Sequence, residues 1–134
     1  MDDVNSLRQN AGNLRKQKSY KEAIAIYQDL WKNNQDKCNE WDGWSYAFCL
    51  RKAGDVKTAY EVSQQVYKKW PDFPNNRGVL AWCIYDLEIN KDSEIIRQNE
   101  SAYFGAASQI LNLVQQDTYS PVARTIFKVI EYLE

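Results

Sequence analysis

The sequence contains no histidine and few cysteines. Histidine is the commonest general base and the commonest metal ligand, so its absence argues against the usual catalytic triads and against most zinc sites. The five glycines form no glycine-rich phosphate loop, and no G-K-S/T motif is present. We therefore expect a protein that is not an enzyme and that carries no metal or cofactor.

Cysteine is also scarce, and the three cysteines form no CxxC pair. An odd number of cysteines without paired spacing does not indicate a disulfide framework, so we expect free thiols in a reducing compartment. Cys49 and Cys83 fall within apolar helical patterns. We expect both to be small core residues, because a cysteine nucleophile without histidine would need another activator.

Long apolar runs are absent too. The longest, GVLAWCIY at 78–85, is far shorter than the roughly 20 residues that cross a bilayer. The N-terminus, MDDVNSLRQN, is acidic and polar, whereas a secretory signal is basic and then apolar. The net charge of −1 and the pI of about 5.5 attract the chain neither to nucleic acid nor to an anionic membrane. We expect a soluble, cytoplasmic protein with no membrane contact.

What the sequence does contain is an internal repeat. Repeats of about 20–50 residues are typical of stacked supersecondary units that cannot bury their apolar faces alone. With 134 residues and 44% hydrophobic content, the chain is expected to form one domain with its own core. The segment 41–71 matches the segment 36 residues earlier at eight identical pairs: Ala11/Ala47, Leu14/Leu50, Arg15/Arg51, Lys16/Lys52, Lys21/Lys57, Ala23/Ala59, Gln28/Gln64 and Lys32/Lys68.

The spacing within the second copy predicts two helices and a tight turn. Tyr46, Ala47 and Leu50 recur at three- and four-residue intervals, which places them on one face of a helix. Gly54 interrupts the pattern, the same period resumes after it, and Pro71 ends the second helix. Small residues stand where the two helices would cross. The repeat is therefore predicted to be an antiparallel helix hairpin, and the fold to be all-α.

This pattern resembles the tetratricopeptide repeat (TPR) family, and the second unit carries it at Trp44, Tyr46, Ala47, Leu50, Gly54, Ala59, Val66 and Pro71. The first unit departs from it at Asn10 and at Lys18, where the family prefers leucine and a turn glycine, which leaves the sharpness of its turn open. The resemblance implies a right-handed superhelical stack of antiparallel helix hairpins. We expect about three units and a C-terminal helix, at about 3–35, 39–71, 75–116 and 121–133.

The third unit is expected to be extended. Its first helix, at about 75–89, matches the second unit at an offset of 34, but the same offset gives its return helix no buried face. An insertion of about 13 residues restores the apolar period and aligns Ala59, Ser63, Val66 and Tyr67 with Ala106, Ile110, Leu113 and Val114. We therefore expect a hairpin tip near 89–94 and a long return helix that ends near Gln116.

A last helix is predicted to begin at Pro121 and to pack on the third return helix, since proline is favoured in the first turn. A repeat stack needs an end cap with a polar outer face, and this helix is a candidate. It stops at Glu134 with no C-cap glycine and no tail. Two alternatives stay open: the chain is complete, or it is a fragment of a longer protein.

In the TPR family the first helix of each hairpin lines a concave groove, so the resemblance implies a groove that binds a partner. We expect a protein–protein interaction module, a scaffold that holds a peptide or partner helix on aromatic rings, with the arginines selecting acidic character. The expected groove residues are Arg8, Arg15, Trp41, Trp44, Phe48, Arg51, Trp82 and Tyr85. Chaperone-binding members hold a terminal carboxylate through Lys and Asn side chains. The paired positions here carry Gly12, Ser45 and Val79, so we expect no such carboxylate clamp.

Several alternatives remain beside this interpretation. Trp44, Phe48 and Trp82 would serve equally well as packing between hairpins. The repeated Arg-Lys pairs at the ends of the first helices would also stabilise the negative helix termini. Single-stranded nucleic acid is a second candidate ligand, because aromatic rings interleaved with basic residues provide stacking and phosphate contacts, but the acidic pI argues against it. A further alternative is that the chain is a purely structural adaptor segment within a larger multidomain protein.

Overall fold

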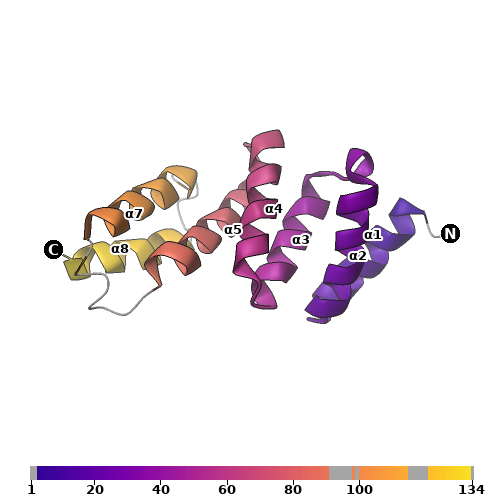
Figure 1. The fold of residues 1–134 in the computed structure, drawn as a ribbon, viewed down its shortest axis with the longest axis horizontal. Helices are drawn as coiled ribbons and strands as arrows, with labels where there is room; N and C mark the ends of the chain where they lie inside the picture. Colours follow the sequence, from indigo (N-terminus) through magenta and orange to yellow (C-terminus); the bar gives the residue numbers. More distant parts are fainter. Residues whose placement is uncertain (1–2, 91–97, 99, 115–120, 134) are drawn as a thin grey trace.

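The computed structural model describes residues 3–90, 98, 100–114 and 121–133. These residues are all-α, with no strand among them, and the predicted fold class is confirmed at that level. A short 3-10 helix lies at Gln35–Lys37 and a π-helix at Tyr85–Ile89. The α-helices are α1 Val4–Lys16, α2 Tyr20–Asn33, α3 Glu40–Lys52, α4 Val56–Lys69, α5 Pro74–Ile84, α7 Glu100–Val114 and α8 Pro121–Leu133 (Figure 1).

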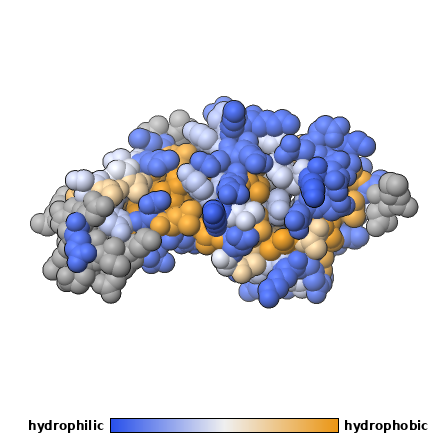
Figure 2. All heavy atoms as spheres, in the orientation of Figure 1, coloured by the Kyte–Doolittle hydropathy of each residue, from blue (hydrophilic) through white to orange (hydrophobic). Residues whose placement is uncertain are grey.

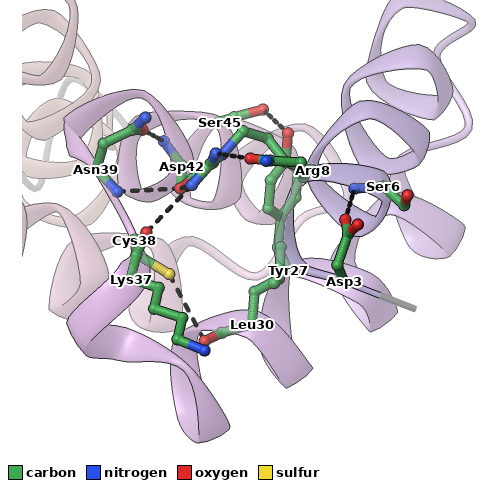
Figure 3. Close-up of polar contacts among 11 residues, drawn as sticks. Asp3, Ser6, Arg8, Tyr27, Leu30, Lys37, Cys38, Asn39, Asp42 and Ser45 are labelled. Carbon is green, nitrogen blue, oxygen red and sulfur yellow. Dashed lines mark hydrogen bonds and ion pairs between the residues drawn. The ribbon is translucent and has the colours of Figure 1, made fainter. Parts of the chain in front are cut away.

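Polar side chains determine where the first helices begin. Asp3 caps α1 by accepting a hydrogen bond of 2.7 Å from the backbone N–H of Ser6. Asn39 and Asp42 form a capping box at the start of α3, in which each side chain accepts a 3.0 Å bond from the backbone N–H of the other (Figure 3). These bonds satisfy backbone N–H groups that the start of a helix otherwise leaves unpaired.

The first two hairpins turn in the same way. Lys18 between α1 and α2 has a φ of 64°, and Gly54 between α3 and α4 has a φ of 97°, so both lie in the left-handed region. In each turn the N–H of the following residue donates to the carbonyl five residues before it. The first hairpin therefore turns as sharply as the second, although its left-handed residue is a lysine, for which this conformation costs more than for glycine.

Each helix packs against the next one along the chain, and α3 also contacts α1 and α5. Figure 1 shows α1 to α5 standing side by side along the long axis. Ala11, Ala23, Ala47 and Ala59 are completely buried at the contacts within and between the first two hairpins. Small side chains there let the helices approach closely. A second cluster of buried residues joins α5, α7 and α8.

Gly43 in α3 is part of this close packing. A Cβ atom at this position would clash with Cγ2 of Val66 on α4 and would lie 3.0 Å from the Trp31 ring of α2. Three helices therefore meet at a residue with no side chain. The repeat comparison did not single out Gly43, because the equivalent residue of the first unit is Leu7.

The return helix expected for the third unit corresponds to α7, whose buried face has a different register from the expected one. The buried residues of α7 are Tyr103, Ala107, Ile110 and Val114. This face matches Ala59, Val62 and Val66 of α4 one residue later than predicted, so Ala106 and Leu113 are only partly buried. The expected hairpin tip near 89–94 is described only as far as Asn90, and the expected helix end near Gln116 lies outside the described residues. The last helix begins at Pro121 as predicted and packs on α7.

None of the described helices combines the length and the apolar character that crossing a bilayer would take.

Replacing Gly43 with alanine should lower the free energy of unfolding by about 1–3 kcal/mol, because the new methyl group overpacks the contact with Val66 and Trp31. Urea denaturation followed by circular dichroism measures this change. Gly12→Ala is the matched control: Gly12 also lies inside a helix, but a Cβ there meets nothing within 4 Å. That variant should gain about 0.5–1 kcal/mol. Equal effects of both substitutions would contradict the close approach at Gly43.

Candidate partner-binding surface

The described part of the chain exposes one row of aromatic rings along α3. Trp41, Trp44 and Phe48 follow each other at spacings of three and four residues, so they share one helix face. Trp41 contacts Trp44 edge-to-face at a centroid distance of 5.8 Å, and Trp44 lies 5.5 Å from Phe48. Phe73 packs against Trp41 at 4.8 Å, and Tyr20 packs against Phe48 at 6.1 Å. We call these five residues the aromatic row.

Exposure varies along the row. Trp41 is 51% exposed, more than the other large hydrophobic residue that stands out on the described surface, Tyr67, at 37%. Trp44 and Phe48 are half-buried, with part of each ring packed on the core beneath. The predicted rings are therefore neither sealed in the core nor free of it. Packing between hairpins and contact with a partner are compatible roles for the same side chains.

A second aromatic pair lies on the neighbouring first helix. Trp82 of α5 contacts Tyr85, the first residue of the π-helix, edge-to-face at 5.5 Å. The Arg51 guanidinium of α3 lies over the Trp82 ring at 5.0 Å from its centroid, and the Arg15 guanidinium of α1 lies over Trp44 at 4.9 Å. Cation–π contacts of this kind join α1 to α3 and α3 to α5.

Arg8 is held by a carboxylate of α3 (Figure 3). Its Nε and Nη2 donate to the two oxygens of Asp42 at 2.7 and 2.8 Å, and Nη2 also donates to the carbonyl of Lys37 at 3.2 Å. Asp42 is only 2% exposed and the Arg8 side chain 30%. The hydrogen bonds that Arg8 donates to Asp42 raise the pKa of Arg8 above its ordinary value. The positive charge of Arg8 therefore pairs with a carboxylate of the protein itself.

A second ion pair joins α3 to the π-helix that follows α5, through residues that are not the repeat equivalents of Arg8 and Asp42. Arg51 of α3 donates through Nε to Asp86 at 2.7 Å and through Nη2 at 3.4 Å. Both members are partly buried. Two of the three arginines that we expected to select acidic partners are thus neutralised by carboxylates of the next unit. That expectation is corrected for Arg8 and Arg51, because a paired guanidinium offers little free charge to a ligand.

Arg15 differs from the other two arginines. Among the described residues no carboxylate lies within ion-pair distance of it, and its buried Nε has no hydrogen-bond partner. It occupies the last turn of α1, next to Lys16, where cations interact favourably with the helix C-terminus. The packing and capping roles foreseen as alternatives therefore fit Arg15 as well as a binding role does.

Sequence reasoning missed both carboxylates of these ion pairs. The residues equivalent to Asp42 and Asp86 in the preceding unit are Ser6 and Lys52, which carry no carboxylate, so the comparison of units gave the two aspartates no weight. For Asp42 a signal was present, since Asn39 and Asp42 stand three residues apart in front of an apolar run, as in a capping box. For Asp86 we find no local signal, because its role depends on a contact between two helices.

Hydrophilic side chains cover most of the face seen in Figure 2, and hydrophobic ones gather around α5.

Within the described ranges, no three carboxylates or thiols come together in a group that could hold a metal ion.

The three thiols are buried and unreactive in character. Burial raises the pKa of Cys38 and Cys49 to about 11 and that of Cys83 to about 12. Thiolate, not thiol, is the nucleophile, so none of these cysteines is activated near neutral pH. The prediction that Cys49 and Cys83 are core residues is confirmed.

Comparisons with protein-family models, with curated proteins and with solved structures find no match for this chain.

The burial of the thiols gives a direct prediction for chemical labelling. At pH 8 the native protein should react with Ellman's reagent far more slowly than the urea-unfolded protein, because pKa values of about 11 and 12 leave very little thiolate at that pH. The absorbance of the released thiolate dye measures the rate. Rapid reaction of all three thiols without denaturant would contradict their placement in the core.

The asymmetry of the two ion pairs gives a second prediction. Asp42→Asn should lower the free energy of unfolding by about 2–3 kcal/mol, because it leaves the half-buried Arg8 without its counter-charge and weakens the α3 cap. Asp86→Asn is the control and should cost about 1 kcal/mol or less, since that pair is more accessible to water. Chemical denaturation measures both. A larger effect at Asp86 would overturn this ranking.

Proposed function

We propose that this chain is a protein-interaction module built as a TPR-like, right-handed stack of helix hairpins. Two features support the stack. The hairpins α1–α2 and α3–α4 turn through the same left-handed backbone conformation, and α3 contacts α1 and α5 as well as its partner α4. In such a stack the first helices α1, α3 and α5 form one layer, and the rings of α3 and α5 belong to it.

The exposure of Trp41 carries the functional proposal. A half-exposed tryptophan is already ordered by edge-to-face contacts with Trp44 and Phe73, so a partner that covers it loses little further side-chain freedom. Tryptophan is also among the residues most enriched in binding hot spots. Covering the ring removes apolar area from water at little entropic cost. The aromatic row is therefore our candidate contact surface.

The ligand that suits this surface is a peptide or a partner helix with large apolar side chains. Single-stranded nucleic acid would use the same rings for stacking, but it also needs a track of free cations. Asp42 and Asp86 neutralise Arg8 and Arg51, which removes two cations from that track. A protein ligand therefore fits the row better than a polyanion does.

Trp41→Ala should weaken the binding of a peptide ligand by at least about tenfold, because it removes the most exposed ring of the row. The ligand is obtained by selecting a random dodecapeptide phage library on the wild-type protein, and its affinity is measured by fluorescence anisotropy. The variant should keep its helical circular dichroism, since the side chain is half in water.

Tyr67→Ala is the matched control for this experiment. Tyr67 is the other exposed large aromatic residue of the described surface, and it lies on α4, outside the aromatic row. Its replacement should leave peptide affinity unchanged. Equal losses from both substitutions would argue against the row as the contact surface. A failure to select any peptide that depends on Trp41 would favour the structural-adaptor alternative.

A further inference from the structure

One end of the aromatic row opens into a basic pocket. The cavity measures about 450 Å³ and lies at the turn between α1 and α2, against the end of α3. Three lysines line it, Lys18, Lys21 and Lys52, together with Tyr20 and a single carboxylate, Glu22. We call this cavity the lysine pocket.

The lysine pocket is continuous with the aromatic row. Tyr20 lines the pocket and packs edge-to-face against Phe48 at a centroid distance of 6.1 Å. Lys52 also lines the pocket, and its Nζ lies 5.5 Å from the centroid of the same Phe48 ring. A ligand that lies along the row therefore meets the three ammonium groups as it passes Phe48.

The positive charge of the pocket is not neutralised internally. Between residues 3 and 90, no carboxylate, Glu22 included, lies within ion-pair distance of Lys18, Lys21 or Lys52. The chain as a whole carries nearly equal numbers of basic and acidic residues. Three unpaired ammonium groups around one cavity are therefore a local excess, and they contrast with Arg8 and Arg51, whose charges are paired.

The next repeat provides an internal comparison. The residues equivalent to Lys18, Lys21 and Lys52 are Gly54, Lys57 and Asp86. Lys18 holds the left-handed conformation with a φ of 64°, whereas the second turn uses glycine there. The first turn thus keeps a lysine at a position where glycine costs less backbone energy. Two of the three positive charges, those of Lys18 and Lys52, are therefore not repeated at the equivalent positions of the next unit, whereas the charge of Lys21 is repeated at Lys57.

We infer that the lysine pocket binds an acidic segment of the protein partner, a run of Asp or Glu residues adjoining the apolar side chains that cover the aromatic row. This inference rests on the proposed protein-interaction function. It adds that the ligand is acidic and that its acidic run lies at the pocket end of the aromatic row. Ammonium groups attract carboxylates, and the apolar rings beside them suit the neighbouring side chains. A nucleic acid would meet free charge in the pocket and at Arg15, whose guanidinium lies over Trp44, whereas Arg8 and Arg51 are paired with carboxylates.

Lys18→Gly is the sharpest test, because it separates binding from stability. Removing the left-handed lysine should raise Tm by about 3 °C. The same substitution should weaken the binding of an acidic peptide about two- to fivefold, since one ammonium group is lost. The probe is the tightest dodecapeptide selected on the wild-type protein, measured by fluorescence anisotropy at low and moderate salt. Weaker binding by a more stable protein cannot come from unfolding.

Lys21→Ser and Lys57→Ser form a matched pair, because the two lysines occupy equivalent positions in successive repeats. Only Lys21 lines the pocket, so only its replacement should weaken the binding of the peptide, again about two- to fivefold. The selected peptides should carry Asp or Glu on one side of their apolar residues, and their affinity should fall with added salt. Equal effects of the two substitutions would overturn the pocket as the acidic site.

The remaining outcomes separate this inference from the proposed function. Selected peptides that depend on Trp41 but lack acidic residues would overturn the inference and leave the proposed function standing. Peptides that depend on neither Trp41 nor the lysines would overturn both. Labelled single-stranded RNA is titrated in parallel. Binding of RNA that is lost in Lys18→Gly and Lys21→Ser, without selection of acidic peptides, would assign the pocket to a polyanion and overturn the proposed acidic protein segment.

Discussion

A buried carboxylate is stable only beside a compensating positive charge, and Asp42 of α3 obtains one from Arg8 of α1. Its two oxygens accept from Arg8, and one of them also accepts from the backbone of Asn39 at the start of α3. The Asp42 side chain therefore caps α3, links α3 to α1 and neutralises the charge of Arg8 in an ion pair. Asp86 and Arg51 make the corresponding link between α3 and the residues that follow α5.

These links determine which chemistry the surface presents. Arg8 and Arg51 are paired with carboxylates, and the rings of α3 and α5 are fixed by edge-to-face and cation–π contacts. A fixed ring loses little freedom on binding, which is the condition under which an aromatic side chain contributes most to affinity. The internal ion pairs and the exposed ring of Trp41 are thus parts of one arrangement rather than independent features.

The periodicity of the sequence was sufficient to predict the helices, because amphipathic spacing and the breaks at Gly54 and Pro71 act locally. The sequence predicted the position of the turn at Lys18 but not its left-handed backbone conformation, since lysine gives no signal for a positive φ. The register of α7 was wrong by one residue, because the insertion before it removed the repeat as a guide. The partners of Arg8 and Arg51 were not predictable from either unit alone, since each ion pair forms between two units.

The first two units share some packing residues and differ at their turns. Ala11 and Ala47 are identical and completely buried, as the close approach of helices requires. Lys18 and Gly54 occupy the same backbone conformation, yet only the first carries a charge. Backbone energy alone would favour glycine at both turns. The acidic ligand that we propose at the end of the aromatic row would account for a lysine at the first turn.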